Sequence, residues 1–302
     1  MSQTKTPTGV WDIKLDLIQE QQSTLEIQPK ISLQQEDNTT KIVIEETTKE
    51  PIKISHTTPG RQDIEVIVKN GVSATIIEKV SDNVITNVSF YICEGSTLNY
   101  ARIQEGTYKG ENTAKVCGTL NYYEINKGTT HNTMKTVIEE NATFTSTNIL
   151  LGLKGDKIHI TPNVLHKKGS TSILNAKAIL QEALGIYDGI VHIPIDAPKS
   201  IAHQRIDALL LTKTSEMKES PQLYIDNKDV ECSHAATSTH TNQEQEFYLQ
   251  TRGLTRAQAQ MITIQATIFE AIQQLPENFQ KEILDDTKQL IKRYVQEQEQ
   301  QS

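Results

Sequence analysis

The sequence predicts a mainly β protein whose strands coil into a β-helix, with a helical region near the C-terminus. Short segments rich in Val, Ile, Thr and Tyr recur over residues 61–250, bordered by Gly, Asn, Asp or Pro, which is typical of β-strands. After residue 251, apolar residues recur at spacings of three and four, as in amphipathic helices. We therefore divide the chain into an extended N-terminal lead-in (1–60), a β core (61–250), a helical hairpin (251–296) and a disordered tail (297–302).

The lead-in is interpreted as extended chain because apolar and polar residues alternate in it. Every second side chain of a strand points to the same face, so each alternating pair would form one apolar face. The pairs are Ile31 and Leu33, Ile42 and Ile44, and Ile52 and Ile54.

The β core suits two architectures, a sandwich or barrel and a β-helix. A sandwich needs hairpin turns, and Asn70-Gly71 is the one good two-residue hairpin signal in the core. Many strand residues are Thr, Asn or Ser, which suits solenoid coils that turn one face to solvent. No exact repeat is visible, but the other two observations favour the β-helix. The strand candidates are residues 63–70, 73–80, 84–92, 97–105, 115–126, 131–139, 143–151, 157–166, 170–180, 185–195 and 221–227.

The helical hairpin is predicted from caps and apolar stripes. Thr255 and Gln258 have the spacing of a capping box at the start of the first helix. Pro276 marks the end of that helix and fits the first turn of the next, where a missing N–H costs nothing. Such helices either cover the open end of a solenoid or dock a partner. The first stripe is Met261, Ile264, Ile268, Ile272 and Leu275, widened by Ile262 and Phe269, and the second is Phe279, Ile283, Leu290, Ile291 and Tyr294.

Charge and composition exclude several classes of function. The 302 residues include 38 acidic and 30 basic side chains, a net charge of −8, and an acidic surface repels the phosphates of nucleic acids. No stretch approaches the roughly 20 apolar residues that a membrane span needs, and the N-terminus lacks the apolar part of a signal peptide. Three cysteines far apart, Cys93, Cys117 and Cys232, fit a reducing compartment. We therefore expect a cytoplasmic protein that binds neither nucleic acid nor membrane.

Cys232 and His234 are the candidate site residues. In a strand they would share one face, because alternate side chains point the same way, and thiolate and imidazole both bind iron or zinc. Taken alone, a Cys-x-His pair favours a structural interpretation, a buried thiol beside a hydrogen-bonded imidazole. The sequence contains no His-Glu-x-x-His, no Gly-x-Ser-x-Gly and no phosphate-binding glycine loop. No catalytic constellation therefore stands out in the sequence.

Other polar residues would meet only through the stacking of coils. Stacking could bring His131, His159 or His166 together, but exposed histidines on a turn or face are the simpler interpretation. Glu78 and Asp188 would likewise form an acid–base pair only through a chance of the tertiary fold.

Several motifs follow one another between about residues 166 and 275. They are Thr171-Ser172, Lys177, GIVHIPIDAPKSIAHQ (189–204), LLL (209–211), PQLYIDNKDVECSHAAT (221–237) and FYLQTRGLTRAQAQ (247–260). In order and spacing this run resembles the SufB/SufD family of iron–sulfur cluster assembly proteins. Residues 64–78 and 93–105 also resemble the core pattern of the family, so the resemblance covers most of the chain after about residue 50.

The resemblance implies a right-handed parallel β-helix flanked by helical segments. Family members pair through their β-helices, either SufB with SufD or as homodimers, and a C-terminal helical region docks the ABC-type ATPase SufC. The chain would thus be a non-catalytic subunit of a SUF-type assembly complex. Its partners would be a SufC-like ATPase and either a SufB-like sister subunit or a second copy of itself. An iron–sulfur cluster would be held transiently, and only in the complex.

The resemblance favours the SufD branch of the family. The SufD-type segment CSHGAT matches Cys232-Ser233-His234, with Ala235 in place of glycine, and this histidine is implicated in iron or cluster handling in SufD-type members. SufB-type members have a glutamate there, and a functional cysteine at the position of Ser215. Serine is a poor iron ligand. The resemblance thus assigns His234 and Cys232 to iron or cluster handling, in a SufD-like subunit or a minimal homodimeric member.

Two other functions remain open. A metal-free interaction protein would have the same paired β-helix but no role for His234. A β-helical polysaccharide lyase or esterase would need Asp, Arg or Lys clustered on one solenoid face and a secreted context, which the missing signal peptide opposes.

Overall fold

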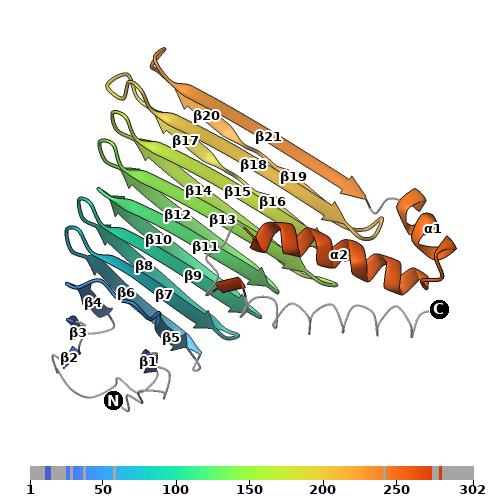
Figure 1. The fold of residues 1–302 in the computed structure, drawn as a ribbon, viewed down its shortest axis with the longest axis horizontal. Helices are drawn as coiled ribbons and strands as arrows, with labels where there is room; N and C mark the ends of the chain where they lie inside the picture. Colours follow the sequence, from blue (N-terminus) through green and yellow to red (C-terminus); the bar gives the residue numbers. More distant parts are fainter. Residues whose placement is uncertain are drawn as a thin grey trace.

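The chain forms a parallel β-solenoid of about six turns, with two helices near the C-terminal end of its described part (Figure 1). The prediction of a mainly β, β-helical protein with a C-terminal helical region is therefore confirmed. Among the helices that are described, none is long and apolar enough to cross a membrane. The structure, a computed structural model, describes residues 11–14, 25–27, 30–36, 39–56, 59–240, 243–273 and 279–280.

The coils build two sheets, here called sheet A and sheet B. Sheet A is parallel throughout, whereas β2, β3 and β4 of sheet B pair antiparallel. In sheet A the order is β1 (Trp11–Lys14), β5 (Ile52–His56), β7 (Ser73–Val80), β9 (Thr97–Glu105), β11 (Thr119–Lys127), β13 (Thr143–Gly152), β15 (Thr171–Leu180), β18 (Ile201–Leu210) and β21 (Glu231–His240). In sheet B the order is β19 (Glu216–Glu219), β16 (Leu184–Tyr187), β14 (Lys157–His166), β12 (Thr130–Ile138), β10 (Tyr108–Val116), β8 (Val84–Ile92), β6 (Gly60–Val68), β4 (Thr39–Ile44), β3 (Ile31–Glu36) and β2 (Leu25–Ile27). In the same sheet β17 (Ile190–Ile193) also pairs with β14, and β20 (Gln222–Ile225) pairs with β17.

Neighbouring coils stack residue on residue although the coils differ in length. Gly60, Val84, Tyr108, Thr130 and Ile158 lie in register along sheet B. Their uneven spacing in the sequence explains why no fixed repeat is visible. The stack also begins within the lead-in, because β4 pairs with β6 and β5 pairs with β7.

Several strand expectations differ from the structure. Residues 185–195, expected as one strand, form β16 and β17, and β18 lies outside the expected strand segments. Asn70-Gly71 does not form a hairpin but a corner between β6 and β7, which belong to different sheets. Gly71 has a φ of +69° there, a conformation that glycine adopts without strain. Residues 115–126, expected as one strand, are divided at Cys117-Gly118, where β10 has ended and β11 has not begun.

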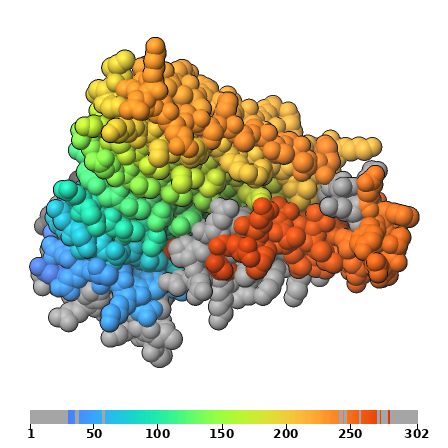
Figure 2. Space-filling view, turned by 45° about the horizontal axis from the view of Figure 1, so that its top comes forward, coloured from blue at the N-terminus to red at the C-terminus, as the bar shows by residue number. Residues whose placement is uncertain are grey.

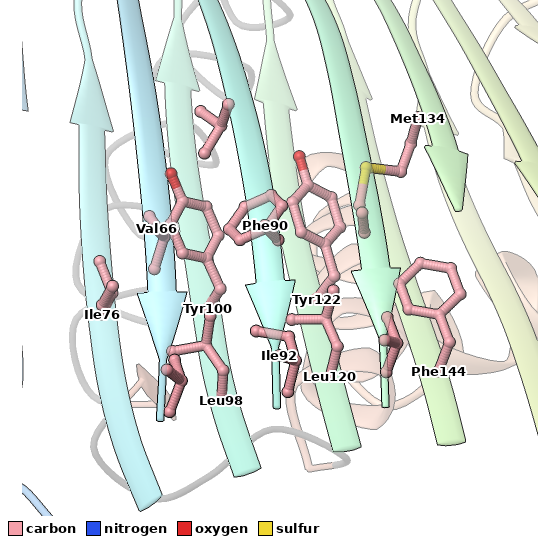
Figure 3. Packing of buried hydrophobic residues seen from close by; sticks show 14 of the residues in the cluster. Val66, Ile76, Phe90, Ile92, Leu98, Tyr100, Leu120, Tyr122, Met134 and Phe144 are labelled. Atoms are coloured by element: carbon pink, nitrogen blue, oxygen red, sulfur yellow. The ribbon is translucent and has the colours of Figure 1, made fainter. Parts of the chain in front are cut away.

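The main core lies between the two sheets. Phe90 of sheet B packs edge-on against Tyr100 of sheet A at a ring distance of 4.7 Å, and Tyr100 stacks on Tyr122 at 5.8 Å (Figure 3). All three side chains are essentially without exposure. Full burial of a large apolar side chain contributes about 1.5–3 kcal/mol, so each of these inward side chains stabilises the solenoid.

The helices α1 (Gln243–Thr251) and α2 (Arg256–Ile272) lie outside the solenoid. The expected capping box is present, since Gln258 N–H donates to Thr255 Oγ1 and Thr255 N–H donates to Gln258 Oε1. Ile264 and Ile268 of α2 are buried in an apolar cluster on the outer face of sheet A. α2 thus covers a flank of the solenoid and not its open end.

The second helix of the expected hairpin lies outside the described residues, apart from residues 279–280, as does the expected tail over 297–302. Phe279 is buried in the same cluster as α2 and its ring lies 5.8 Å from that of Tyr123.

Candidate functional site

β21 forms one end of the solenoid. It pairs with β18 and with no further strand among the described residues, so its outer edge is free. Nearly all of its side chains are exposed. Figure 1 shows this orange strand at the end of the stack, and Figure 2 shows the same end facing solvent. A free strand edge has N–H and C=O groups ready to pair with another chain.

Cys232 and His234 share the inward face of β21, as the alternation in the sequence predicts. Their register neighbours on β18, Ala202 and Gln204, are 0% and 2% exposed in the solenoid interior. Cys232 is half-buried against the main core, whereas His234 is exposed because no coil covers it. The two side chains therefore lie where the interior opens to solvent.

The Cys232–His234 pair supplies only part of a ligand set. Burial raises the pKa of the Cys232 thiol, a hydrogen bond with the Ala202 backbone opposes this, and the Glu231 carboxylate adds to it. The thiol is thus protonated at neutral pH until a metal displaces the proton. In the described part of the chain, no three His, Cys, Asp or Glu side chains converge as a metal site, whereas clusters are held by about four ligands.

Ser215, which the sequence resemblance places at the position of the SufB-type cysteine, lies at a corner of the solenoid. Its Oγ donates to the Leu180 carbonyl at 2.8 Å and accepts from the Glu182 N–H at 3.0 Å. This corner follows the C-terminal end of β18, whereas Cys232 pairs near the N-terminal end of that strand. The structure does not bring Ser215 together with the candidate site residues.

The interior also contains a polar cluster that the sequence interpretation missed. Glu78, Arg102 and Glu124 occupy one register row on β7, β9 and β11, and each is 0% exposed. Arg102 Nε donates to Glu78 at 2.5 Å, and its Nη1 lies 3.6 Å from Glu124. We call these three residues the buried ionic row. The sequence does carry a signal for this cluster, because each strand has a charged residue at an inward position. On β9 and β11 that residue lies two positions after an inward tyrosine, Tyr100 or Tyr122.

The two carboxyl groups of the buried ionic row differ in their electrostatics. Burial by itself raises the pKa of Glu78, but Arg102, His56 and Tyr100 outweigh it and lower that pKa to about 2. Burial also raises the pKa of Glu124, and here Arg102 and Asn132 oppose the rise only in part. The row therefore holds one firm ion pair, Glu78–Arg102, and one carboxyl that is costly to ionise.

Stacking brings together two of the three histidines considered above. His131 and His159 are register neighbours on the outer face of sheet B, with ring centroids 4.8 Å apart. His159 Nε2 lies 2.7 Å from Asp188, so Asp188 does not pair with Glu78. His166 is separate: it is buried, bonds Ser170 and Ser172, and burial lowers its pKa to about 4.

The architecture defines a class of protein: a two-sheet parallel β-solenoid with helices on one flank and a Cys-x-His strand at a free end. A family model described as SUF system FeS cluster assembly, SufBD core domain, matches residues 58–267. The chain therefore belongs to the SufBD family, which takes part in iron–sulfur cluster assembly.

Individual relatives agree with this assignment. The chain is 26% identical over 238 residues to an iron–sulfur cluster assembly SufBD family protein of Synechocystis, covering 70% of this chain and 52% of that protein. It is 29% identical over 147 residues to the iron–sulfur cluster assembly protein SufD of Escherichia coli, covering 48% and 35% of the two chains. For SufD of Bacillus subtilis the identity is 26% over 172 residues, with 56% and 39% covered. The chain thus spans about half or less of the length of these relatives.

Proposed function

We propose that this chain is a non-catalytic subunit of a SUF-type iron–sulfur cluster assembly complex in the cytoplasm. The observation that carries the proposal is the free edge of β21, which has Cys232 and His234 on its inward face. A polar, unpaired strand at the open end of a solenoid is suited to pairing with another chain. In this proposal the β-helix pairs through that end, and the cluster is cargo held transiently in the complex.

A partner at β21 would complete the ligand set. Two donors on one strand are too few for a cluster, and a chain paired beside them brings its own donors to the same place. A second copy would place two His234 side chains about one two-fold axis. The Cys-Ser-His segment and the serine at position 215 favour the other arrangement, a SufD-like subunit beside a SufB-like sister.

The proposal places an ABC-type ATPase on the helices. Both helices carry exposed apolar side chains, and a contiguous exposed apolar surface marks a site of protein interaction. A groove of about 410 Å³ lies between α1 and α2, lined in part by Tyr248, Leu249 and Ile262. Among the helix side chains that the structure describes, the large apolar ones that are exposed are Phe247, Tyr248, Ile262 and Phe269.

Anaerobic affinity purification of the tagged full chain from its native host, with partners identified by mass spectrometry, tests the proposal. We expect to recover an ABC-type ATPase together with a SufB-like sister. Recovery of the ATPase with further copies of this chain alone would favour the homodimeric form. Absence of any ATPase under gentle conditions would contradict the docking role of the helices.

Two variants separate the surfaces in that experiment. Ala236→Asp introduces a charge that is solvated in the free chain, since Ala236 is exposed, but buried once a partner covers β21. It should lose the sister and keep the ATPase. Phe247→Ser removes exposed apolar surface from α1. This variant should lose the ATPase and keep the sister. Loss of both partners in either variant, with the fold intact, would contradict two separate surfaces.

A metal-free interaction protein is the second candidate, favoured by the lack of a convergent ligand group among the described side chains. Unchanged cluster delivery in cells that carry His234→Ala would favour this candidate over the first.

A further inference from the structure

Cys93 and Cys117 lie at the same corner of two neighbouring coils. Cys93 directly follows β8 and Cys117 directly follows β10, and these strands pair with Ile92 opposite Val116. The Cys117 N–H donates to the Ile92 carbonyl at 2.7 Å. The two cysteines therefore occupy equivalent positions on two neighbouring, hydrogen-bonded coils.

The next residues hold the corner together as well. The Thr119 N–H donates to the Ser96 carbonyl at 2.8 Å. Between the two hydrogen bonds, Gly118 lies so close to the lower turn that an added Cβ would be 2.6 Å from the Cys93 oxygen and 2.3 Å from the Ser96 oxygen. A side chain at this position would force the coils apart, so the glycine permits the close approach.

This register places the two Cα atoms within the separation that a disulfide can span. Neighbouring strands lie about 4.7–4.9 Å apart, and disulfides join Cα atoms about 4.4–6.8 Å apart. Both cysteines are free and half-buried, so reagents in solution reach them. Burial, then Glu139 and, more weakly, Cys93 raise the pKa of the Cys117 thiol, which agrees with two thiols close enough to interact.

We propose that Cys93 and Cys117 form a reversible disulfide between the two coils, a thiol-oxidation site separate from Cys232. With glutathione disulfide as the oxidant, the thiolate of one cysteine attacks it, forms a mixed disulfide and releases one glutathione. The second cysteine loses its proton and attacks the mixed disulfide, which releases the other glutathione. Two protein thiols are oxidised, and one glutathione disulfide is reduced to two glutathiones.

The bond would tie one coil to the next at a single corner. It closes the segment that contains β9 and β10, and so restrains separation of these coils. Cys232 lies in register with Ala202 on the adjacent strand, so it has no thiol opposite it there. Oxidation should therefore be selective for the Cys93–Cys117 corner within one chain.

The test uses the full chain carrying Cys232→Ser, which prevents links through the third thiol. The chain is incubated with glutathione disulfide, alkylated, digested and mapped by mass spectrometry. We expect a linked Cys93–Cys117 peptide pair from one chain, reversed by a thiol reductant. When Cys93→Ser or Cys117→Ser is added, the remaining thiol should carry glutathione instead.

Three results would overturn the proposal: both cysteines alkylated in the oxidised folded chain, links only between chains, or a link that forms only in urea. Gly118→Ala is a matched control, because it keeps both thiols while pushing the coils apart. Its disulfide should form roughly tenfold more slowly at an unchanged circular dichroism spectrum. If the disulfide formed at an unchanged rate in Gly118→Ala, the close approach of the two coils at this corner would not be what favours the disulfide. If Gly118→Ala fails to fold, the serine variants still decide the outcome.

Discussion

Arg102 and Glu78, register neighbours on two strands of sheet A, form an ion pair at 2.5 Å with both side chains 0% exposed. A buried charge without its partner is strongly unfavourable, because the low-dielectric interior replaces none of the lost hydration. This pair lies among the tyrosines of the main core, so its integrity affects the stability of the central coils.

Arg102→Met should destabilise the fold by about 3–5 kcal/mol, since it leaves Glu78 buried without its cation. The free energy of unfolding in urea measures this loss. The matched control is Arg205→Met, which removes an exposed ion pair with Asp207 and should change stability by less than about 1 kcal/mol. Equal losses in the two variants would contradict the importance of the buried pair.

Substitution by Gln at neutral pH should destabilise the fold at Glu78 but not at Glu124. The folded-state pKa of Glu78, about 2, lies below the ordinary value of 4.5. Its stabilisation is therefore present above about pH 4.5 and lost as the pH falls toward 2, roughly 3 kcal/mol in all. Glu78→Gln should remove this stabilisation at neutral pH and flatten the acid limb of the stability curve.

The pKa of Glu124 shifts in the opposite direction to that of Glu78, because burial raises its folded-state pKa above 4.5. Ionisation of Glu124 thus opposes folding at neutral pH, and its contribution improves as the pH falls. Glu124→Gln should leave the unfolding free energy at pH 7 unchanged or higher, and the Gln oxygen can still accept from Asn132. Urea unfolding of both variants from pH 3 to 8 checks the signs. If Glu124→Gln lowered the unfolding free energy at pH 7 as much as Glu78→Gln does, the predicted difference between the two carboxyl groups would be contradicted.

Ile268 and Phe269 are neighbours on α2 with different roles. Ile268 is 2% exposed against sheet A and Phe269 is 49% exposed. Ile268→Ala should cost about 2–5 kcal/mol through the cavity it leaves and increase hydrogen exchange along α2. Phe269→Ala should leave exchange unchanged but weaken recovery of the ATPase. Hydrogen exchange measures the first effect and co-purification the second. Full recovery of the ATPase with Phe269→Ala would contradict the proposed docking face.

Local patterns predicted the elements whose signals are local. The capping box and apolar stripe of α2 depend on residues three or four apart. The structure has the capping box and buries Ile264 and Ile268 of the stripe, whereas Ile262 and Phe269 are exposed. The shared face of Cys232 and His234 likewise follows from alternation. Their role in cluster handling stays a prediction.

Features that depend on coil length could not be predicted in this way. The first part of β10 lacks a strand signal because its inward positions include Gly110 and Asn112, where an amide hydrogen bond to Asn132 replaces apolar packing. The contact between Glu78 and Arg102 requires the register of two coils. Because successive coils differ in length, no repeat in the sequence sets that register.

We propose that His234 handles iron or a cluster at the open end of the solenoid. The most direct test of this claim is the iron and acid-labile sulfide content of the anaerobically purified complex, with and without His234→Ala. We expect the parent complex to carry both elements. The variant should lose them roughly tenfold or more while it keeps its partners and its fold. Equal iron and sulfide in the two complexes, or none in the parent complex, would contradict the claim.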